Sequence, residues 1–237
     1  MKTRAFFLAI VISIGTLFIV SSCEDFFDTG LTEEEVIEGL KEALKVGTDN
    51  SVLKANEANG YYLHEFIKIP FPPEAQTAKE VMIDYLGMEE TVEDFILELN
   101  RAAEDAAIKA KPIYIDAITS ITINDAWDIL LGEDNAATMY LHTKTFDSLF
   151  AAFSPDISNS LEKVGASQTW AYLVNIYNDY AYYSPIHDPI DTDLGAYATG
   201  RALDGLFFLI EEEELKIRTD PSARISEILQ RVFAEQD

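Results

Sequence analysis

Imidazole and carboxylate side chains that could hold a metal ion gather in one irregular stretch, residues 181–193. Calcium takes about six to eight oxygen ligands, and aspartates at alternate positions can supply several of them. The stretch lacks the glycine and the distant glutamate of a helix–loop–helix calcium site, and its last aspartate could instead cap the helix that follows. The sequence thus indicates a candidate metal site, beside the simpler interpretation of a connecting loop. The candidate ligands are His187, Asp188, Asp191 and Asp193.

Tyrosines are concentrated immediately before this loop. A tyrosine offers a flat apolar ring with a polar tip, which suits contacts with sugars or peptides. The concentration predicts a surface for a ligand or a partner. Under the alternative interpretation, the first two tyrosines face the core and the last two pin the loop. The four residues are Tyr177, Tyr180, Tyr182 and Tyr183.

A third polar group, Asn100, Arg101 and Glu104, lies close together in an alanine-rich segment. Alanines at this density favour close helix packing, which would bury the three side chains in a structural polar network. On a solvent-facing side, Arg101 and Glu104 would instead form an ordinary pair that stabilises by roughly 0.2–0.5 kcal/mol. The acidic run Glu211–Glu214 is interpreted as a solvated helix surface, because four adjacent helical residues cannot all face one ligand.

The usual sequence signatures of catalysis are missing. The histidines His64, His142 and His187 belong to no two-histidine zinc motif. No Gly-x-Ser-x-Gly elbow supports a nucleophilic serine, and the 11 glycines do not cluster into a phosphate-binding loop. We expect no cofactor. The enzymatic alternative that stays open is a hydrolase acting through a pair of carboxylates.

The N-terminus has the pattern of a secretory signal. Two basic residues precede a nearly unbroken apolar run over residues 5–20, which is shorter than the roughly 20 residues that span a membrane. The four residues Val-Ser-Ser-Cys that end at Cys23 resemble a bacterial lipobox, and this cysteine is the only one in the chain. We therefore expect residues 1–22 to be a cleaved lipoprotein signal peptide, Cys23 to carry the lipid, and residues 23–30 to form a short tether. The alternative is an uncleaved anchor with an incidental cysteine.

The formal net charge of −25 narrows the range of partners. Loss of Lys2 and Arg4 with residues 1–22, which contain no acid, makes it −27. We expect no nucleic acid partner, because phosphates bind clustered lysine and arginine. Anionic lipid also repels an acidic body, so the lipid on Cys23 must hold the protein at the membrane. We expect a location in the cell envelope, at the outer membrane, with the periplasmic or surface-facing side left open.

Apolar residues recur every three or four positions after the tether, which predicts helices. No stretch alternates long enough for a convincing strand, and no internal repeat or flexible linker divides the chain. We therefore predict an all-α fold, a single compact multi-helix domain over residues 31–237 behind the cleaved signal peptide.

Capping residues and prolines give the expected ends of several helices. Thr32 and Glu35 have the spacing of a capping box at the start of the first helix. Thr91 and Pro112 are expected to begin new helices, since a threonine can cap and proline suits the first helical turn. A later helix is expected to end before Pro155. Gly165 is expected to separate the two helices that follow.

Short motifs lie along these expected helices: Asn100-Arg101-Ala102-Ala103-Glu104, Lys111-Pro112-Ile113, Asp125-Ala126, Ile129-Leu130 with Gly132, Asn135-Ala136-Ala137-Thr138 with Tyr140, Ala202-Leu203-Asp204-Gly205-Leu206-Phe207, Glu212-Glu213 through Ile217-Arg218, and Asp220-Pro221. In this order they resemble an uncharacterised bacterial family, domain of unknown function 4197, over essentially residues 31–237. The resemblance implies a secreted or lipidated, mostly helical protein, and it favours the network interpretation of the Asn100 group. It implies no activity. The chain departs from the family pattern in its tyrosine-rich segment 177–183 and at Asn135, where the pattern predicts aspartate.

The leading interpretation is a non-enzymatic envelope lipoprotein, held at the membrane by its lipid, that binds an envelope protein or a small ligand. The lipid anchor, the helical body and the lack of a catalytic set support it. Two alternatives are a carboxylate-dependent hydrolase of the cell envelope and a passive structural lipoprotein. A cleft holding a carboxylate with a raised pKa would favour the hydrolase, whereas an exposed apolar patch would favour the binding protein.

Overall fold

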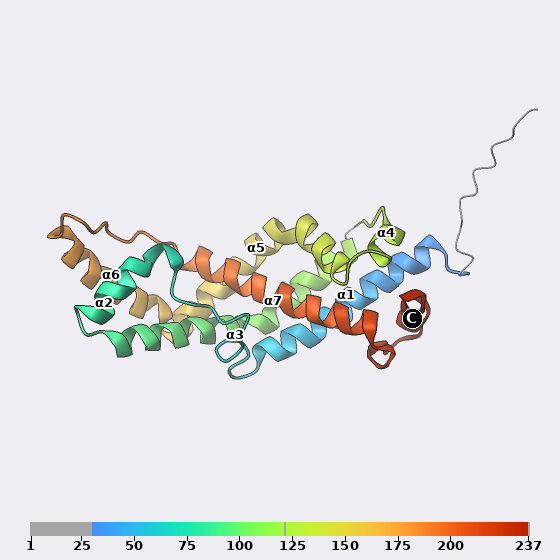
Figure 1. The fold of residues 1–237 in the computed structure, drawn as a ribbon, viewed down its shortest axis with the longest axis horizontal. Coiled ribbons are helices and arrows are strands. Elements are labelled where there is room, and N and C mark those ends of the chain that lie inside the picture. The colour runs from blue at the N-terminus through green and yellow to red at the C-terminus, as the bar shows by residue number, and fades with distance from the viewer. Residues whose placement is uncertain (1–29, 121, 237) are drawn as a thin grey trace, which may run out of the picture. The chain divides into compact units, whose positions relative to one another are not determined.

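In the computed structural model, which describes residues 30–120 and 122–236, every regular element is a helix and none is a strand (Figure 1). The predicted all-α fold is confirmed. The α-helices are α1 (Glu33–Asn56), α2 (Gln76–Asp84), α3 (Glu89–Ser120), α4 (Ala126–Leu130), α5 (Ala136–Val164), α6 (Ala166–Tyr182), α7 (Leu194–Thr219) and α8 (Glu227–Phe233). Short 3₁₀ helices lie at Pro73–Ala75, Pro221–Ala223 and Ala234–Gln236.

Local signals begin and end several helices where the sequence predicts. The Thr32 hydroxyl accepts from the Glu35 N–H at 3.2 Å, and the Glu35 carboxylate accepts from the Thr32 N–H at 2.9 Å. The predicted capping box is therefore confirmed. Gly165 separates α5 from α6 in the left-handed conformation, with φ of 94°. At the start of α7, the Asp193 carboxylate accepts from the Ala196 N–H at 2.9 Å.

Three predicted helix boundaries are wrong: the starts at Thr91 and Pro112 and the end before Pro155. Helix α3 begins before Thr91 and continues through Pro112, and α5 continues through Pro155. A proline removes one backbone hydrogen bond and crowds the carbonyl four residues earlier. Both prolines are exposed, and so are the residues that carry those two carbonyls. Water can satisfy the carbonyls on these faces, so the helices persist.

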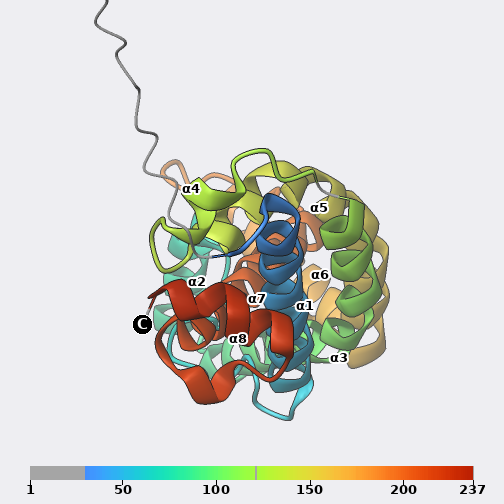
Figure 2. The same ribbon diagram turned by 90° about the vertical axis from the view of Figure 1, so that its right-hand side faces the viewer.

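Four long helices build the core: α1 and α5 each pack against both α3 and α7. The buried face of α3 is rich in small side chains, which let its neighbours approach closely. Gly205 on α7 meets the same need, because a Cβ at this position would lie 2.6 Å from a ring carbon of Tyr61. Helix α8 lies beside the first half of α1, as Figure 2 shows. The buried alanines of α3 are Ala102, Ala103, Ala106, Ala107 and Ala110.

The described residues from Leu31 onward group into one compact unit. Helix α1 begins at one end of this unit, and the loop that follows α6, residues 183–193, lies at the opposite end (Figure 1). Among the helices of the described residues, none is long and apolar enough to cross a membrane.

Candidate functional site

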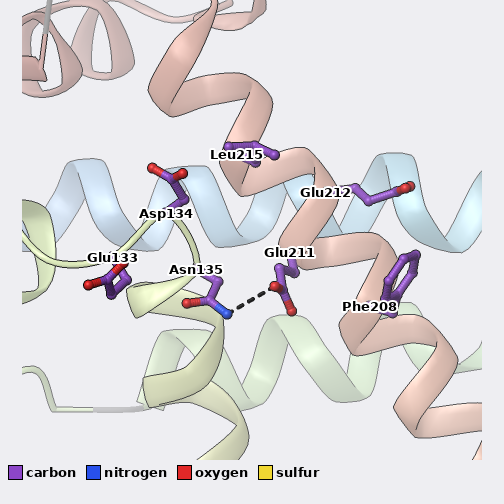
Figure 3. A pocket seen from close by; sticks show the side chains of 7 residues that line it. All are labelled: Glu133, Asp134, Asn135, Phe208, Glu211, Glu212 and Leu215. Atoms are coloured by element: carbon purple, nitrogen blue, oxygen red, sulfur yellow. Dashed lines mark hydrogen bonds between the residues drawn. The ribbon is translucent and has the colours of Figure 1, made fainter.

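A pocket of about 440 Å³ lies where α7 faces the segment leading into α5 (Figure 3). The side chains of Asn135 and Glu211 point toward one another across it, and the Asn135 Nδ2 donates a hydrogen bond of 2.9 Å to Glu211 Oε1. We call this the acidic pocket. Its lining consists of Glu133, Asp134, Asn135, Phe208, Glu211, Glu212 and Leu215.

The acidic pocket has four carboxylates and no basic side chain among the described residues that line it. Lys54 on α1 reaches Glu212 from outside the lining, with an N–O distance of 3.0 Å. Clustered carboxylates on a concave surface build a negative potential that attracts cations and repels anions. The pocket therefore suits a positively charged group.

Aromatic side chains border the acidic pocket through Phe208. The ring of Phe66 stacks on the ring of Phe208 with centroids 5.4 Å apart, and His64 meets these rings edge-on at 6.4 and 6.0 Å. Phe66 is 64% exposed. We call His64, Phe66 and Phe208 the aromatic rim. An exposed apolar cluster next to a pocket marks a place where a ligand or partner can gain contact area.

A buried carboxylate holds the two walls of the acidic pocket together. Glu214 on α7 accepts from the N–H groups of Ala137 and Thr138 at 3.0 and 2.7 Å, and from the Thr138 hydroxyl at 2.6 Å. The first N–H groups of a helix lack partners inside the helix, and the N-cap Asn135 provides no side-chain cap. Glu214 therefore caps α5 and fixes its start on α7.

An arginine balances this carboxylate. Arg218 lies 2.8 Å from Glu214, and both side chains are 2% exposed. The guanidinium also donates to the carbonyls of Ile129 and Leu130 in α4 at 3.1 and 2.7 Å. The pair thus ties together α4, α5 and α7, and each partner uses several hydrogen bonds to offset its desolvation.

The interpretation of Glu211–Glu214 as a solvated surface is wrong for Glu214, which is 1% exposed. The sequence did hold a signal for its burial. Ile210, Glu214 and Ile217 continue the apolar spacing of α7, and Arg218 follows four residues after Glu214, where a helical ion pair can form. The backbone groups that Glu214 caps lie 76 and 77 positions earlier in the chain, so no local sequence pattern could identify them.

The predicted polar residues of α3 bind the segment between α1 and α2. Asn100 is fully buried. Its Oδ1 accepts from the Ile69 N–H at 2.8 Å, and its Nδ2 donates to the carbonyls of Ile69 and Ile96 at 2.7 Å each. A single side chain therefore satisfies both backbone groups of a buried residue in an irregular segment.

Glu104 and Arg101 hold the other end of this segment. The Glu104 carboxylate accepts from the N–H groups of Tyr61 and Tyr62 at 3.2 and 3.1 Å and from Arg101 at 2.5 Å. Arg101 also donates to the Asn59 side chain at 2.8 Å, where the backbone adopts φ of 70°. With Asn100, these bonds pin the segment that carries the aromatic rim to α3.

Tyr61 connects the same segment to α7. Its hydroxyl donates to the Ala202 carbonyl at 2.6 Å. Burial raises the pKa of Tyr61, so the phenol stays protonated and keeps donating. The aromatic rim is therefore held from two helices, α3 and α7.

A second, open pocket of about 550 Å³ lies beside this network. Its charged groups are largely engaged within the protein: Glu104 binds Arg101, and Asp105 binds Lys163 and Ser160. It therefore offers a ligand less free charge than the acidic pocket does. The lining consists of Asn56, Ala58, Leu97, Glu98, Arg101, Glu104, Asp105 and Val164.

The four predicted tyrosines divide between core and surface. Tyr177 is 2% exposed and belongs to the core, so the prediction of a surface position is wrong for this residue. Tyr180 is half-buried, with its ring 6.4 Å from that of Tyr177. Tyr182 and Tyr183 are 82% and 85% exposed, and their rings meet edge-on at 4.9 Å. The end of α6 therefore presents two adjacent tyrosines to solvent.

The predicted metal ligands His187, Asp188, Asp191 and Asp193 are not brought together. Within the described part of the chain, no group of three or more histidine, cysteine or acidic side chains could hold a metal ion. Asp193 instead caps α7. The loop is held by Asn178, whose side chain accepts from the N–H of Ile190 at 2.7 Å and donates to its carbonyl at 3.2 Å.

The three histidines lie in different surroundings. His64 is part of the aromatic rim, His142 packs edge-on against Phe207 at 4.6 Å, and His187 lies 5.6 Å from the ring of Tyr180. The predicted lipidation residue Cys23 lies outside the described residues, as do the predicted signal peptide and nearly all of the predicted tether.

Comparison with known proteins assigns the family. Searches of the curated proteins and of the solved structures found no match. The model of the family DUF4197, described as a protein of unknown function, matches residues 30–234. The match covers nearly the whole described domain and confirms the resemblance noted in the motifs, so the chain belongs to the DUF4197 family.

Proposed function

We propose that the chain is a lipid-anchored protein of the bacterial envelope whose helical domain binds a partner protein through an exposed tyrosine surface. The observation that carries this proposal is the exposure of three apolar side chains at the end of α6 and in the loop after it. Tyr182, Tyr183 and Ile186 are 82%, 85% and 80% exposed. We call them the tyrosine tip. Tyrosine is enriched at protein–protein interfaces and among their hot-spot residues, so this position favours binding of a partner protein.

The charge around the tyrosine tip favours a partner with basic residues. No lysine or arginine occurs between Lys163 and Arg201, whereas Asp179, Asp188, Asp191 and Asp193 all lie in this interval. Complementary charge speeds encounter and selects among partners, while the aromatic rings supply the contact area.

The expected anchor suits this arrangement. The lipobox resemblance predicts a lipid on Cys23, and a tether of eight residues reaches roughly 25 Å at about 3.3 Å per residue. The tyrosine tip lies at the end of the domain opposite the start of α1 (Figure 1). A lipid on Cys23 would hold the start of α1 close to the membrane and leave the tip available to a partner.

The anchor is tested by changing Cys23 to Ser in cells. The expected result is a chain that is unprocessed or released from membranes, detected by fractionation and by the mass of the N-terminal peptide. A mutant that is still cleaved after Ser22 and still bound to membranes would contradict lipidation.

The partner surface is tested with a photo-crosslinking amino acid placed at Tyr182 or Tyr183 in living cells. Tyr85, which is 75% exposed, is the matched control position. We expect one defined adduct from both tip positions, none from Tyr85, and loss of the adduct when Ile186 is changed to Ser. The same adduct from all three positions, or none at the tip, would contradict the proposal.

A further inference from the structure

We infer that the aromatic rim and the acidic pocket form one docking surface for a basic, amphipathic segment of another protein. This surface is separate from the tyrosine tip and rests on different residues. The aromatic rim is its apolar half, and the acidic pocket is its charged half, in which all the charged lining residues are acidic. The two halves meet at Phe208, which belongs to both.

The apolar half supplies contact area without rearrangement. Phe66 is 64% exposed, and Leu215 on the pocket wall is 41% exposed. Phe66 is already stacked on Phe208, so an incoming apolar side chain meets an ordered surface. The buried hydrogen bonds of Glu104 and Glu214 fix the two segments that carry this surface, which lowers the ordering cost of binding.

The charged half selects a cation. Glu133 and Asp134 are exposed, and Glu211 bonds to the neutral amide of Asn135. Of the four lining carboxylates, Glu212 forms an ion pair with Lys54, and no ion pair to the other three occurs among the described residues. A lysine or arginine can lie between these carboxylates, and its charge can also contact the face of an exposed ring. Salt should weaken such binding.

Other occupants fit this surface less well. A second copy of the chain carries the same net charge of −25, so its approach would set acid against acid. An anionic membrane is repelled for the same reason. A bare metal ion lacks a ligand set, since the part of the chain that the structure describes has no suitable group of three or more side chains. A basic segment with apolar residues satisfies both halves at once.

The test uses the full chain in phosphatidylcholine vesicles and a fluorescent amphipathic helical peptide of lysine and leucine as the probe. Anisotropy measures binding against empty vesicles as the baseline. The triple variant Asp134→Asn, Glu211→Gln and Glu212→Gln should weaken binding about tenfold, because each exposed ion pair contributes a small part. The matched control is Glu89→Gln, Glu90→Gln and Glu93→Gln at the start of α3, which removes the same charge elsewhere.

The apolar half is tested separately. Phe66→Ser should weaken binding about fivefold or more, because an exposed aromatic anchor is lost. Tyr85→Ser, also an exposed aromatic on another surface, should leave binding unchanged. Circular dichroism of each variant establishes that its helices are intact.

Two peptide controls complete the design. A peptide with glutamate in place of lysine, and a peptide with serine in place of leucine, should both bind at least about tenfold more weakly. Equal binding by the glutamate peptide would overturn the inference, and so would equal weakening by the pocket and control triple variants. Unchanged binding by Phe66→Ser would remove the aromatic rim from the surface and overturn it as well.

Discussion

The substitution Glu214→Gln tests whether a buried ion pair organises the domain. Gln keeps the size of the side chain and one acceptor oxygen, but it removes the charge that balances Arg218 at 2.8 Å. It also places an amide nitrogen where one oxygen accepts backbone and hydroxyl hydrogen bonds from α5. Both partners of the pair are 2% exposed, so solvent cannot compensate.

Breaking a buried pair by removing one partner lowers the free energy of unfolding by about 3–5 kcal/mol. For a domain of roughly 200 residues, each kcal/mol corresponds to about 2–4 °C in melting temperature. Glu214→Gln should therefore lower the melting temperature by about 6–20 °C. The assay is thermal unfolding followed by far-ultraviolet circular dichroism.

Glu213→Gln is the matched control, since it makes the same chemical change at the next residue. Glu213 accepts from Lys216, whose side chain is 54% exposed, and from the Asn50 amide at 2.7 Å. Gln keeps an acceptor oxygen for Asn50 and loses the pair with Lys216, and pairs with a solvent-exposed cation contribute about 0–1 kcal/mol. The control should therefore melt within about 4 °C of the wild type.

The charge interaction is isolated by a double variant, Glu214→Gln with Arg218→Gln. Removal of both charges should cost about 1–3 kcal/mol less than the sum of the two single effects, because the single variants each leave one buried charge unbalanced. Additive effects, or a Glu214→Gln protein as stable as the Glu213→Gln control, would refute the role assigned to the pair.

Two further predictions concern packing and pH. Gly205→Ala should destabilise the protein by about 1–3 kcal/mol, because its Cβ would lie 2.6 Å from the Tyr61 ring. Gly200→Ala, whose Cβ would lie 3.9 Å from its nearest neighbouring atom, should instead stabilise the protein by up to about 1 kcal/mol. Urea unfolding of both variants measures these changes, and equal effects would contradict the prediction. The hydrogen bond that Lys163 donates holds the pKa of Asp105 below its ordinary value of 3.8, so this carboxylate contributes stability above pH 3.8 that is lost as the pH falls through the lowered folded-state pKa. Wild type should therefore exceed Asp105→Asn in stability at pH 7 and lose that advantage below pH 3.8, and a difference that persists unchanged in acid would count against the assignment.

Features that depend on neighbours in sequence were predictable. The capping box of Thr32 and Glu35, the break at Gly165 and the cap at Asp193 each involve residues within about four positions. The helical periodicity that predicted the fold class is local too, because an apolar face repeats every three or four residues.

The wrong predictions share one physical cause: each depended on whether a group faces solvent or the core. Whether Pro112 or Pro155 ends a helix depends on whether the carbonyl four residues earlier faces solvent, and whether Tyr177 is surface or core depends on how α6 lies on its neighbours. Neither property is set by the residue itself. The same holds for Glu214, because the backbone and hydroxyl groups that donate to it lie in α5, which begins far earlier in the chain.

The two buried carboxylates Glu104 and Glu214 explain why a docking surface can be both ordered and acidic. Each accepts two consecutive backbone N–H groups from a segment that builds the surface, and each is balanced by an arginine of its own helix, Arg101 or Arg218. A buried carboxylate without such a partner would be strongly destabilising. These arginines therefore neutralise the buried carboxylates and not those that line the acidic pocket. Of the carboxylates that line the acidic pocket, Glu212 pairs with Lys54, and the other three have no ion pair among the described residues and can meet the charge of a ligand.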